Sequence, residues 1–186
     1  GTGCLGRGTG VMTRHAPVTA HTPTTVLVTG GGGFVGRAVV KQLLARGDHV
    51  HSFARGVYPD LAESGVEVFS GDLADAAAVG RACAGCDVVF HIAAKAGIWG
   101  GYGGYCDTNV RGTDHVLAAC AEHGVGRLVY TSSPAVVFNG RSMAGVDESV
   151  PYPRRHHSHY AATKALGEQA VLAANGSTLR TVALRP

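Results

Sequence analysis

The sequence lacks the long apolar runs that mark membrane and secreted proteins. No segment is apolar for long enough to span a bilayer, and residues 1–24 contain no apolar core of the length that a signal peptide needs. Charge is also scarce, because 16% of the residues are charged and the net charge of +3 is scattered along the chain. These absences argue against a membrane span and against nucleic-acid binding, and we expect a cytoplasmic location.

Cysteine and metal-ligand patterns are equally sparse. The chain has five cysteines, and the pair Cys83 and Cys86 has no second pair to complete a zinc or disulfide framework. His156, His157 and His159 lie close together in the sequence, but no carboxylate or cysteine partner is evident. We therefore expect no metal site, a solvated loop for the histidines, and packing roles for the two cysteines.

The N-terminal segment lacks hydrophobic periodicity and is rich in glycine, threonine and other small residues. We expect residues 1–24 to be a disordered or non-native extension, with Met12 as a candidate start. Residues 25–186 are long enough for one domain with a substantial core.

Within that domain, apolar strand-like runs alternate with helix-like runs along the whole chain. This alternation is typical of an α/β fold with a parallel sheet. It predicts a Rossmann-type, doubly wound arrangement. The predicted strands are residues 25–29, 49–53, 66–70, 88–92, 127–131 and 178–184, and the predicted helices are 34–46, 74–83, 108–123 and 158–175.

A glycine-rich turn, TGGGGFVG at residues 29–36, directly follows the first apolar run. Such a turn between a buried strand and a helix is typical of dinucleotide-binding sites. Gly30 permits the tight turn, Gly33 lets the pyrophosphate approach the backbone, and Gly36 lets the helix pack closely on the strand. The phosphates are then expected at the helix N-terminus, where unpaired N–H groups favour anions.

A second motif, YAATK, places Tyr160 and Lys164 four residues apart in a predicted helix, so they share one helix face. A free tyrosine has a pKa near ~10, and a neighbouring ammonium group lowers it. Upstream, residues 131–133 (TSS) end a predicted strand and offer hydroxyl groups for a carbonyl oxygen. Together these groups predict an acid–base site beside a nicotinamide ring.

With both motifs in place, the chain resembles the extended short-chain dehydrogenase/reductases of the NAD-dependent epimerase/dehydratase superfamily. It is most similar to the bacterial 3β-hydroxysteroid dehydrogenase-like and 2-alkyl-3-oxoalkanoate reductase group. The resemblance covers roughly residues 25–186. Besides the two motifs above, it rests on GDL (71–73), HIAA (91–94), KAGIWG (95–100), NVRGT (109–113), YTSS (130–133) and LRP (184–186).

The resemblance implies a catalytic role for Ser133, Tyr160 and Lys164. Tyr160 is the expected proton donor in ketone reduction, Lys164 the group that lowers its pKa, and Ser133 the hydroxyl that orients the carbonyl. Ser132 is the alternative serine. In relatives the asparagine at position 109 shapes the active-site backbone.

By the same resemblance, a set of positions around the glycine turn binds the cofactor. Asp72 matches the position that holds the adenine amino group in relatives, although the residue is also a candidate helix N-cap. The expected cofactor contacts are Gly30, Gly33, Phe34, Val35, Gly36, Arg55, Asp72, Leu73, Ala93, Tyr160 and Lys164.

The end of the second predicted strand bears on cofactor choice. NAD-binding proteins usually place an acidic residue there for the ribose 2′-OH. This chain has the sequence FARG at residues 53–56 instead. An arginine at this place pairs well with a 2′-phosphate, so Arg55 favours NADP(H) over NAD(H), and Arg37 is a second candidate contact.

The loop at residues 95–105 carries the only tryptophan, two tyrosines and five glycines. It favours a small hydrophobic substrate, either a sterol or a β-keto acid. We therefore expect an NAD(P)-dependent oxidoreductase that interconverts a secondary alcohol and a ketone. A nucleotide-sugar epimerase or dehydratase, and a non-catalytic NAD(P)-binding fragment or redox sensor, remain alternatives.

Relatives in this group continue well past the equivalent of residue 186. The resemblance therefore also implies that the sheet is incomplete at the C-terminus, that the substrate-binding region is missing, and that the chain is a fragment. Relatives often dimerise, so a homodimer is a further expectation.

Overall fold

The computed structural model describes residues 21–186. Most of the expected N-terminal extension, with the candidate start Met12, lies outside the described residues. Within residues 21–186, no helix combines the length and the apolar character needed to cross a membrane.

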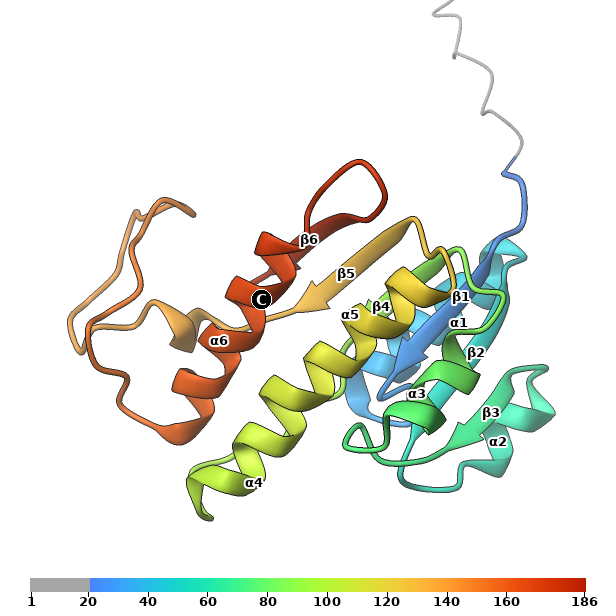
Figure 1. The fold of residues 1–186 in the computed structure, drawn as a ribbon, viewed down its shortest axis with the longest axis horizontal. Helices are drawn as coiled ribbons and strands as arrows, with labels where there is room; N and C mark the ends of the chain where they lie inside the picture. The colour runs from blue at the N-terminus through green and yellow to red at the C-terminus, as the bar shows by residue number, and fades with distance from the viewer. Residues whose placement is uncertain (1–20) are drawn as a thin grey trace, which may run out of the picture.

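Six parallel strands form one sheet in the order β3-β2-β1-β4-β5-β6 (Figure 1). The order reverses between β1 and β4, as in a doubly wound Rossmann-type sheet. The strands are β1 (Thr25–Thr29), β2 (His49–Ala54), β3 (Glu67–Ser70), β4 (Val88–His91), β5 (Arg127–Thr131) and β6 (Arg180–Leu184).

Helices cover the sheet on both faces (Figure 1). Helices α3, α5 and α6 pack on one face, and α1 and α2 pack on the other. The helices are α1 (Phe34–Arg46), α2 (Pro59–Glu63), α3 (Ala76–Cys83), α4 (Tyr102–Cys106), α5 (Gly112–Glu122) and α6 (His159–Ala173), with a π-helical turn η1 (Asp107–Arg111) and a 3-10 turn η2 (Pro134–Val136).

Strand β1 is buried on both faces, which explains its unbroken apolar sequence. Leu27 packs under α3 and α5, whereas Val26 and Val28 pack under α1 and α2. Toward β6 the second face becomes exposed, because Val182 and Leu184 are about half exposed. The sheet is thus incompletely covered at its β6 edge, as expected.

The predicted elements agree with most of the structure. The bounds of β1, α1 and β5 are those that the sequence pattern predicts, and α1 ends at Gly47, whose positive φ of 90° suits glycine. The prediction for 74–83 begins too early, because Asp75 caps α3 by accepting the amide of Ala78 at 3.0 Å.

The prediction for residues 108–123 is also wrong at its start. A continuous helical segment begins at Tyr102 and passes through η1 into α5. The second half of the predicted 95–105 loop is therefore helical, and Tyr105 within it is 1% exposed. The short helix α2 has no counterpart in the prediction.

Asp48, just after α1, is a buried carboxylate that joins three segments. It accepts hydrogen bonds from the Thr24 amide at 3.1 Å, from Arg46 Nε at 2.6 Å and from His21 Nε2 at 2.7 Å. Burial acts to raise the pKa of Asp48, but these hydrogen bonds outweigh it and hold the pKa well below its usual value.

We expect Asp48→Asn to lower the free energy of unfolding at pH 7 by about 1.5–3 kcal/mol, since it weakens several charge-assisted hydrogen bonds. The folded-state pKa is depressed, so this stabilisation is present above the unfolded pKa of about 3.9 and is lost as the pH falls below it. Urea unfolding at pH 7 and pH 3 measures both effects.

The matched control for this substitution is Asp107→Asn, which breaks an exposed ion pair with Arg111. That change should cost no more than about 0.5 kcal/mol. Equal losses in the two variants would contradict the role given to Asp48.

Candidate active site

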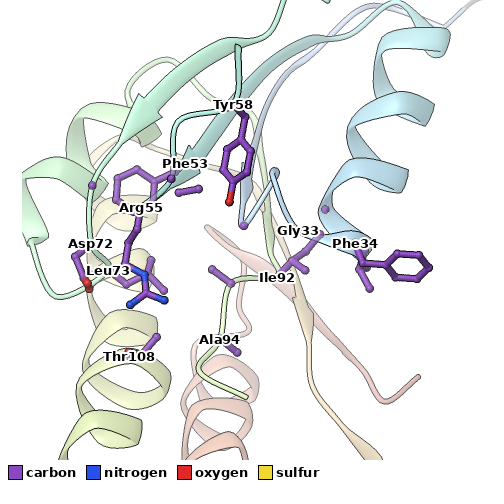
Figure 2. A pocket seen from close by; sticks show the side chains of 17 residues that line it. Gly33, Phe34, Phe53, Arg55, Tyr58, Asp72, Leu73, Ile92, Ala94 and Thr108 are labelled. Atoms are coloured by element: carbon purple, nitrogen blue, oxygen red, sulfur yellow. The ribbon is translucent and has the colours of Figure 1, made fainter. Parts of the chain in front are cut away.

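A cleft of about 460 Å³ lies at the carboxyl ends of β1, β2, β3 and β4, where the strand order reverses (Figure 2). This is the place where doubly wound sheets bind ligands. Predicted cofactor residues that line it are Gly30, Gly33, Phe34, Val35, Gly36, Arg55, Asp72, Leu73 and Ala93. The cleft is also lined by Phe53, Gly71 and Ile92, which belong to motifs quoted above, and by Tyr58 and Thr108, which the sequence analysis missed.

The glycine turn is built by close backbone packing. Gly30 has a φ of +75°, and its carbonyl oxygen accepts the amide of Gly33 at 2.9 Å. A Cβ atom at Gly36 would overlap that same carbonyl group. Gly33 precedes α1 with no side-chain cap, so the first amides of the helix are left for a ligand in the cleft.

The opposite wall of the cleft is the backbone after β4. A Cβ atom on Gly30 would lie 3.0 Å from the N and Cα atoms of Ala93, so this wall leaves no room for a side chain at position 30. Thr29 holds Ala93 in place, because its hydroxyl accepts the Ala93 amide at 3.2 Å and the Ile92 amide at 3.1 Å.

His91 extends this wall into the interior. Its Nδ1 lies 2.8 Å from the Thr29 hydroxyl, and its Nε2 lies 3.0 Å from the Thr113 hydroxyl. The Thr113 hydroxyl donates to the carbonyl oxygen of Asn109 at 2.8 Å, so it accepts from His91. Burial lowers the pKa of His91 to about 3, and the imidazole is therefore a neutral, structural group.

Asn109 ties the loop after β4 to α6 from within η1. Its side chain accepts the amide of Lys95 at 2.8 Å and donates to the Lys95 carbonyl oxygen at 3.0 Å. It also donates to the Thr163 hydroxyl at 3.1 Å. Asn109 is 2% exposed, which excludes a simple helix-surface role. Further along the loop, Trp99 is 85% exposed.

Two cationic side chains flank the β2 end of the cleft. Arg55 is exposed and points along the cleft in Figure 2. Arg37, the second candidate for a 2′-phosphate, instead pairs with Asp60, donates to the Gly32 carbonyl oxygen at 3.1 Å and lies 5.4 Å from the centre of the Tyr58 ring. Arg37 thus braces the glycine turn against the loop that carries Tyr58.

Asp72 lies beside Leu73, on the side of the cleft away from Gly33 and Phe34 (Figure 2). Its carboxylate accepts the amide of Ala74 at 2.9 Å and forms a local turn. It does not cap α3, since Asp75 does. The carboxylate is exposed, so it remains accessible to a ligand.

The two candidate serines differ in their surroundings. Ser133 is half-buried and its oxygen accepts the amide of Ala135 at 3.2 Å, which leaves its hydroxyl proton free to donate. Ser132 is 4% exposed, and its hydroxyl has no partner at normal hydrogen-bonding distance among residues 21–186.

Tyr160 and Lys164 lie one turn apart near the start of α6, which Ser158 caps by accepting the amide of Ala161 at 3.1 Å. Tyr160 is half-buried. Lys164 is 2% exposed, donates from Nζ to the Thr131 carbonyl oxygen at 2.7 Å and lies 3.9 Å from the centre of the Tyr130 ring. Neither residue lines the cleft itself.

Burial lowers the pKa of Lys164 to about 7, against an opposing effect of the Glu168 carboxylate. The side chain is therefore close to its protonation midpoint at neutral pH. Such a shifted amine next to a half-buried tyrosine is typical of a functional site.

The backbone that lines the cleft has the shape and the free amides that a dinucleotide needs. The space that a Cβ atom would fill at Gly36 is taken by the turn, and the uncapped start of α1 offers amides to a phosphate. Chain segments after four strands supply its walls. The residues present therefore fit the predicted NAD(P) cofactor.

Comparison with known proteins agrees with this geometry. The model of the 3-beta hydroxysteroid dehydrogenase/isomerase family matches residues 27–186. A 2-alkyl-3-oxoalkanoate reductase of Stenotrophomonas maltophilia is 54% identical over 164 residues, which are 87% of this chain and 49% of that protein. A 3 beta-hydroxysteroid dehydrogenase/Delta 5→4-isomerase of Mycobacterium tuberculosis is 43% identical over 169 residues, 87% of this chain and 46% of that protein.

Solved structures show the same fold. A short-chain dehydrogenase/reductase superfamily protein from Agrobacterium tumefaciens with bound NAD is 33% identical with a TM-score of 0.76, covering 87% of this chain and 48% of that one. A Thermus thermophilus UDP-glucose 4-epimerase complex with NAD is 33% identical with a TM-score of 0.75, covering 87% and 54%. The chain spans about half the length of the curated relatives it matches.

We expect Gly36→Ala to reduce NADH and NADPH affinity by more than about tenfold, because the added methyl group overlaps the Gly30 carbonyl and displaces the turn. Fluorescence titration of the reduced cofactor measures the effect. Gly176→Ala is the control, since a Cβ atom there meets open space and the residue lies away from the cleft. Unchanged affinity in Gly36→Ala would refute the site.

Proposed function

The chain belongs to the 3-beta hydroxysteroid dehydrogenase/isomerase family, and from that premise we propose that it carries the nucleotide-binding and catalytic residues of an NAD(P)-dependent oxidoreductase. The reaction interconverts a secondary alcohol and a ketone on a hydrophobic substrate. The observation that carries the proposal is the buried Lys164, one helical turn from Tyr160 and anchored to the Thr131 carbonyl oxygen.

In the reductive direction, Tyr160 donates its phenolic proton to the carbonyl oxygen of the substrate. The charged form of Lys164 stabilises, by its positive field, the phenolate that this transfer leaves, and a proton from solvent then restores the phenol. The bound cofactor supplies the hydride.

Ser133 is the proposed ligand of the substrate carbonyl oxygen. Its oxygen already accepts the Ala135 amide, so its proton remains available to the substrate. Pro134 keeps the Ser133 backbone extended, with a φ of −160°, and so fixes the direction of the hydroxyl. Ser132 is too buried to serve the same role without rearrangement.

The names of the relatives suggest two types of substrate for this chain. One is a 2-alkyl-3-oxoalkanoate and the other is a 3β-hydroxysteroid or its ketone. The exposed Ile98 and Trp99 after β4 offer an apolar surface for either type. A nucleotide-sugar epimerase is the second candidate, favoured by the similarity to the Thermus enzyme.

We expect Tyr160→Phe to lower kcat for ketone reduction by at least about 100-fold, because it removes the proton donor and leaves the cleft intact. The assay follows oxidation of NADPH or NADH with 2-alkyl-3-oxoalkanoates and 3-ketosteroids. Glu122→Gln, at the exposed C-terminal end of α5, is the control and should keep its activity. Full activity in Tyr160→Phe would exclude the catalytic assignment.

NADP(H) is the proposed cofactor, because Arg55 stands beside the cleft where NAD-binding proteins usually have an acidic residue. We expect Arg55→Ala to weaken NADPH binding about tenfold or more and to leave NADH binding within twofold, since only NADPH carries the 2′-phosphate. Arg127→Ala, at the opposite end of the sheet, is the control. Equal effects on both cofactors would remove the basis for the preference.

A further inference from the structure

Glu168 is a buried carboxylate that the proposed reaction does not use. It is 1% exposed and lies one turn after Lys164 on α6. A buried carboxylate is costly unless it is paired and hydrogen-bonded. Glu168 is paired: its Oε1 accepts from Arg185 Nη2 at 2.5 Å and from the Tyr152 hydroxyl at 2.6 Å.

These partners connect three parts of the structure next to the candidate serines. Arg185 directly follows β6, Tyr152 lies in the segment before α6, and Glu168 belongs to α6. The Arg185 guanidinium also lies over the Tyr152 ring at 5.7 Å. The ion pair therefore sets the position of the β6 end relative to α6.

Both of those elements hold the backbone that leads to Ser133. From β6, the Leu184 carbonyl oxygen accepts the Ser132 amide at 2.7 Å. From α6, Lys164 donates to the Thr131 carbonyl oxygen at 2.7 Å. Thr131 and Ser132, the two residues before Ser133, are therefore held by hydrogen bonds from both α6 and β6. Because Glu168 joins α6 to the end of β6, it fixes the position of these two hydrogen bonds relative to each other.

Glu168 also bears on the charge of Lys164. The titratable and charged groups around this turn are Tyr160 and Glu168 on α6, His91 on β4, Tyr130 on β5, Tyr152 and Arg185 beside them, and Glu148, which lines the same hollow as Glu168 and Arg185.

Most of these groups do not help to keep the amine charged. Burial lowers the pKa of His91 to about 3, and burial raises that of Tyr152 to about 12 and that of Tyr130 further still, so all three are neutral near pH 7. Among the described residues, the Glu168 carboxylate is the group that raises the pKa of Lys164.

We propose that Glu168 is a positioning residue of the active site: held by Arg185 and Tyr152, it locks β6 to α6, and its carboxylate, one helical turn from Lys164, supports that amine as the donor to the Thr131 carbonyl oxygen. This inference rests on the proposed function. It acts through Lys164 and the serine segment and involves no contact with the substrate.

The first test measures the coupling without any enzyme assay. The test is a double-mutant cycle of the wild type, Glu168→Gln, Lys164→Met and the double variant. Urea unfolding at pH 6 and pH 9 gives the unfolding constant of each protein. The folded-state pKa of Lys164 is below its unfolded value, so the buried amine is charged at pH 6 and neutral at pH 9. We expect a favourable coupling of about fivefold in the unfolding constant at pH 6 and none at pH 9.

Asp107→Asn combined with Lys164→Met is the control cycle, because Asp107 pairs with Arg111 at an exposed site. It should show no coupling at either pH. Should Glu168→Gln fail to fold, Glu168→Asp replaces it and should keep at least half of the wild-type coupling at pH 6. No coupling, or coupling independent of pH, overturns the proposal.

The second test follows function. In Glu168→Gln we expect NADPH affinity within about threefold, since the cleft is built by other elements, and a kcat at pH 7 about tenfold lower. The alkaline limb of the kcat profile should move to lower pH, because loss of the carboxylate favours the neutral amine. A merely structural role would not shift that limb.

The outcomes separate the two proposals. An unchanged kcat and an unshifted profile in Glu168→Gln would overturn the role of Glu168. The stability cycle could instead show the expected coupling between Glu168 and Lys164 while the wild-type chain reduces no ketone. That result would count against the proposed function and leave the role of Glu168 standing.

Discussion

The close approach of α1 to β1 is the constraint on which the rest of the structure depends. Gly36 has no room for a side chain against the Gly30 carbonyl, and Gly30 in turn has no room for one against the backbone of Ala93. Because Thr29 and His91 hold the Ala93 segment, the same contact sets both walls of the cleft. The cofactor site is therefore a product of backbone packing more than of side-chain chemistry.

The chemical end of the site depends on buried polar groups instead. Lys164 and Glu168 are both almost fully buried on one helix. Interactions with β5 and the end of β6 offset the free-energy cost of burying these two charged groups. The Thr131 carbonyl oxygen and the Tyr130 ring contact Lys164, and Arg185 pairs with Glu168. This arrangement links Lys164, and with it the proposed acid–base pair, to strands far away in the sequence, and it makes α6 the element on which the proposed catalytic geometry depends.

Local signals explain where the sequence predictions agree with the structure. A glycine turn, apolar runs and glycine C-caps act within a few residues, so α1 and β1 have the predicted bounds. Long-range packing explains the errors. Tyr102–Cys106 is helical despite two glycines, because Tyr105 is buried and its hydroxyl donates to the Trp99 carbonyl oxygen at 2.9 Å. Pro59–Glu63 forms a helix too short for a periodic pattern.

The sequence by itself determined the doubly wound fold, the dinucleotide turn and the spacing of Tyr160 and Lys164, because each depends on neighbours along the chain. Only the tertiary structure decided that Arg37 is engaged by Asp60 and that Glu168 meets Arg185. Such pairs depend on which side chains from distant parts of the chain meet in the fold, so no local pattern records them.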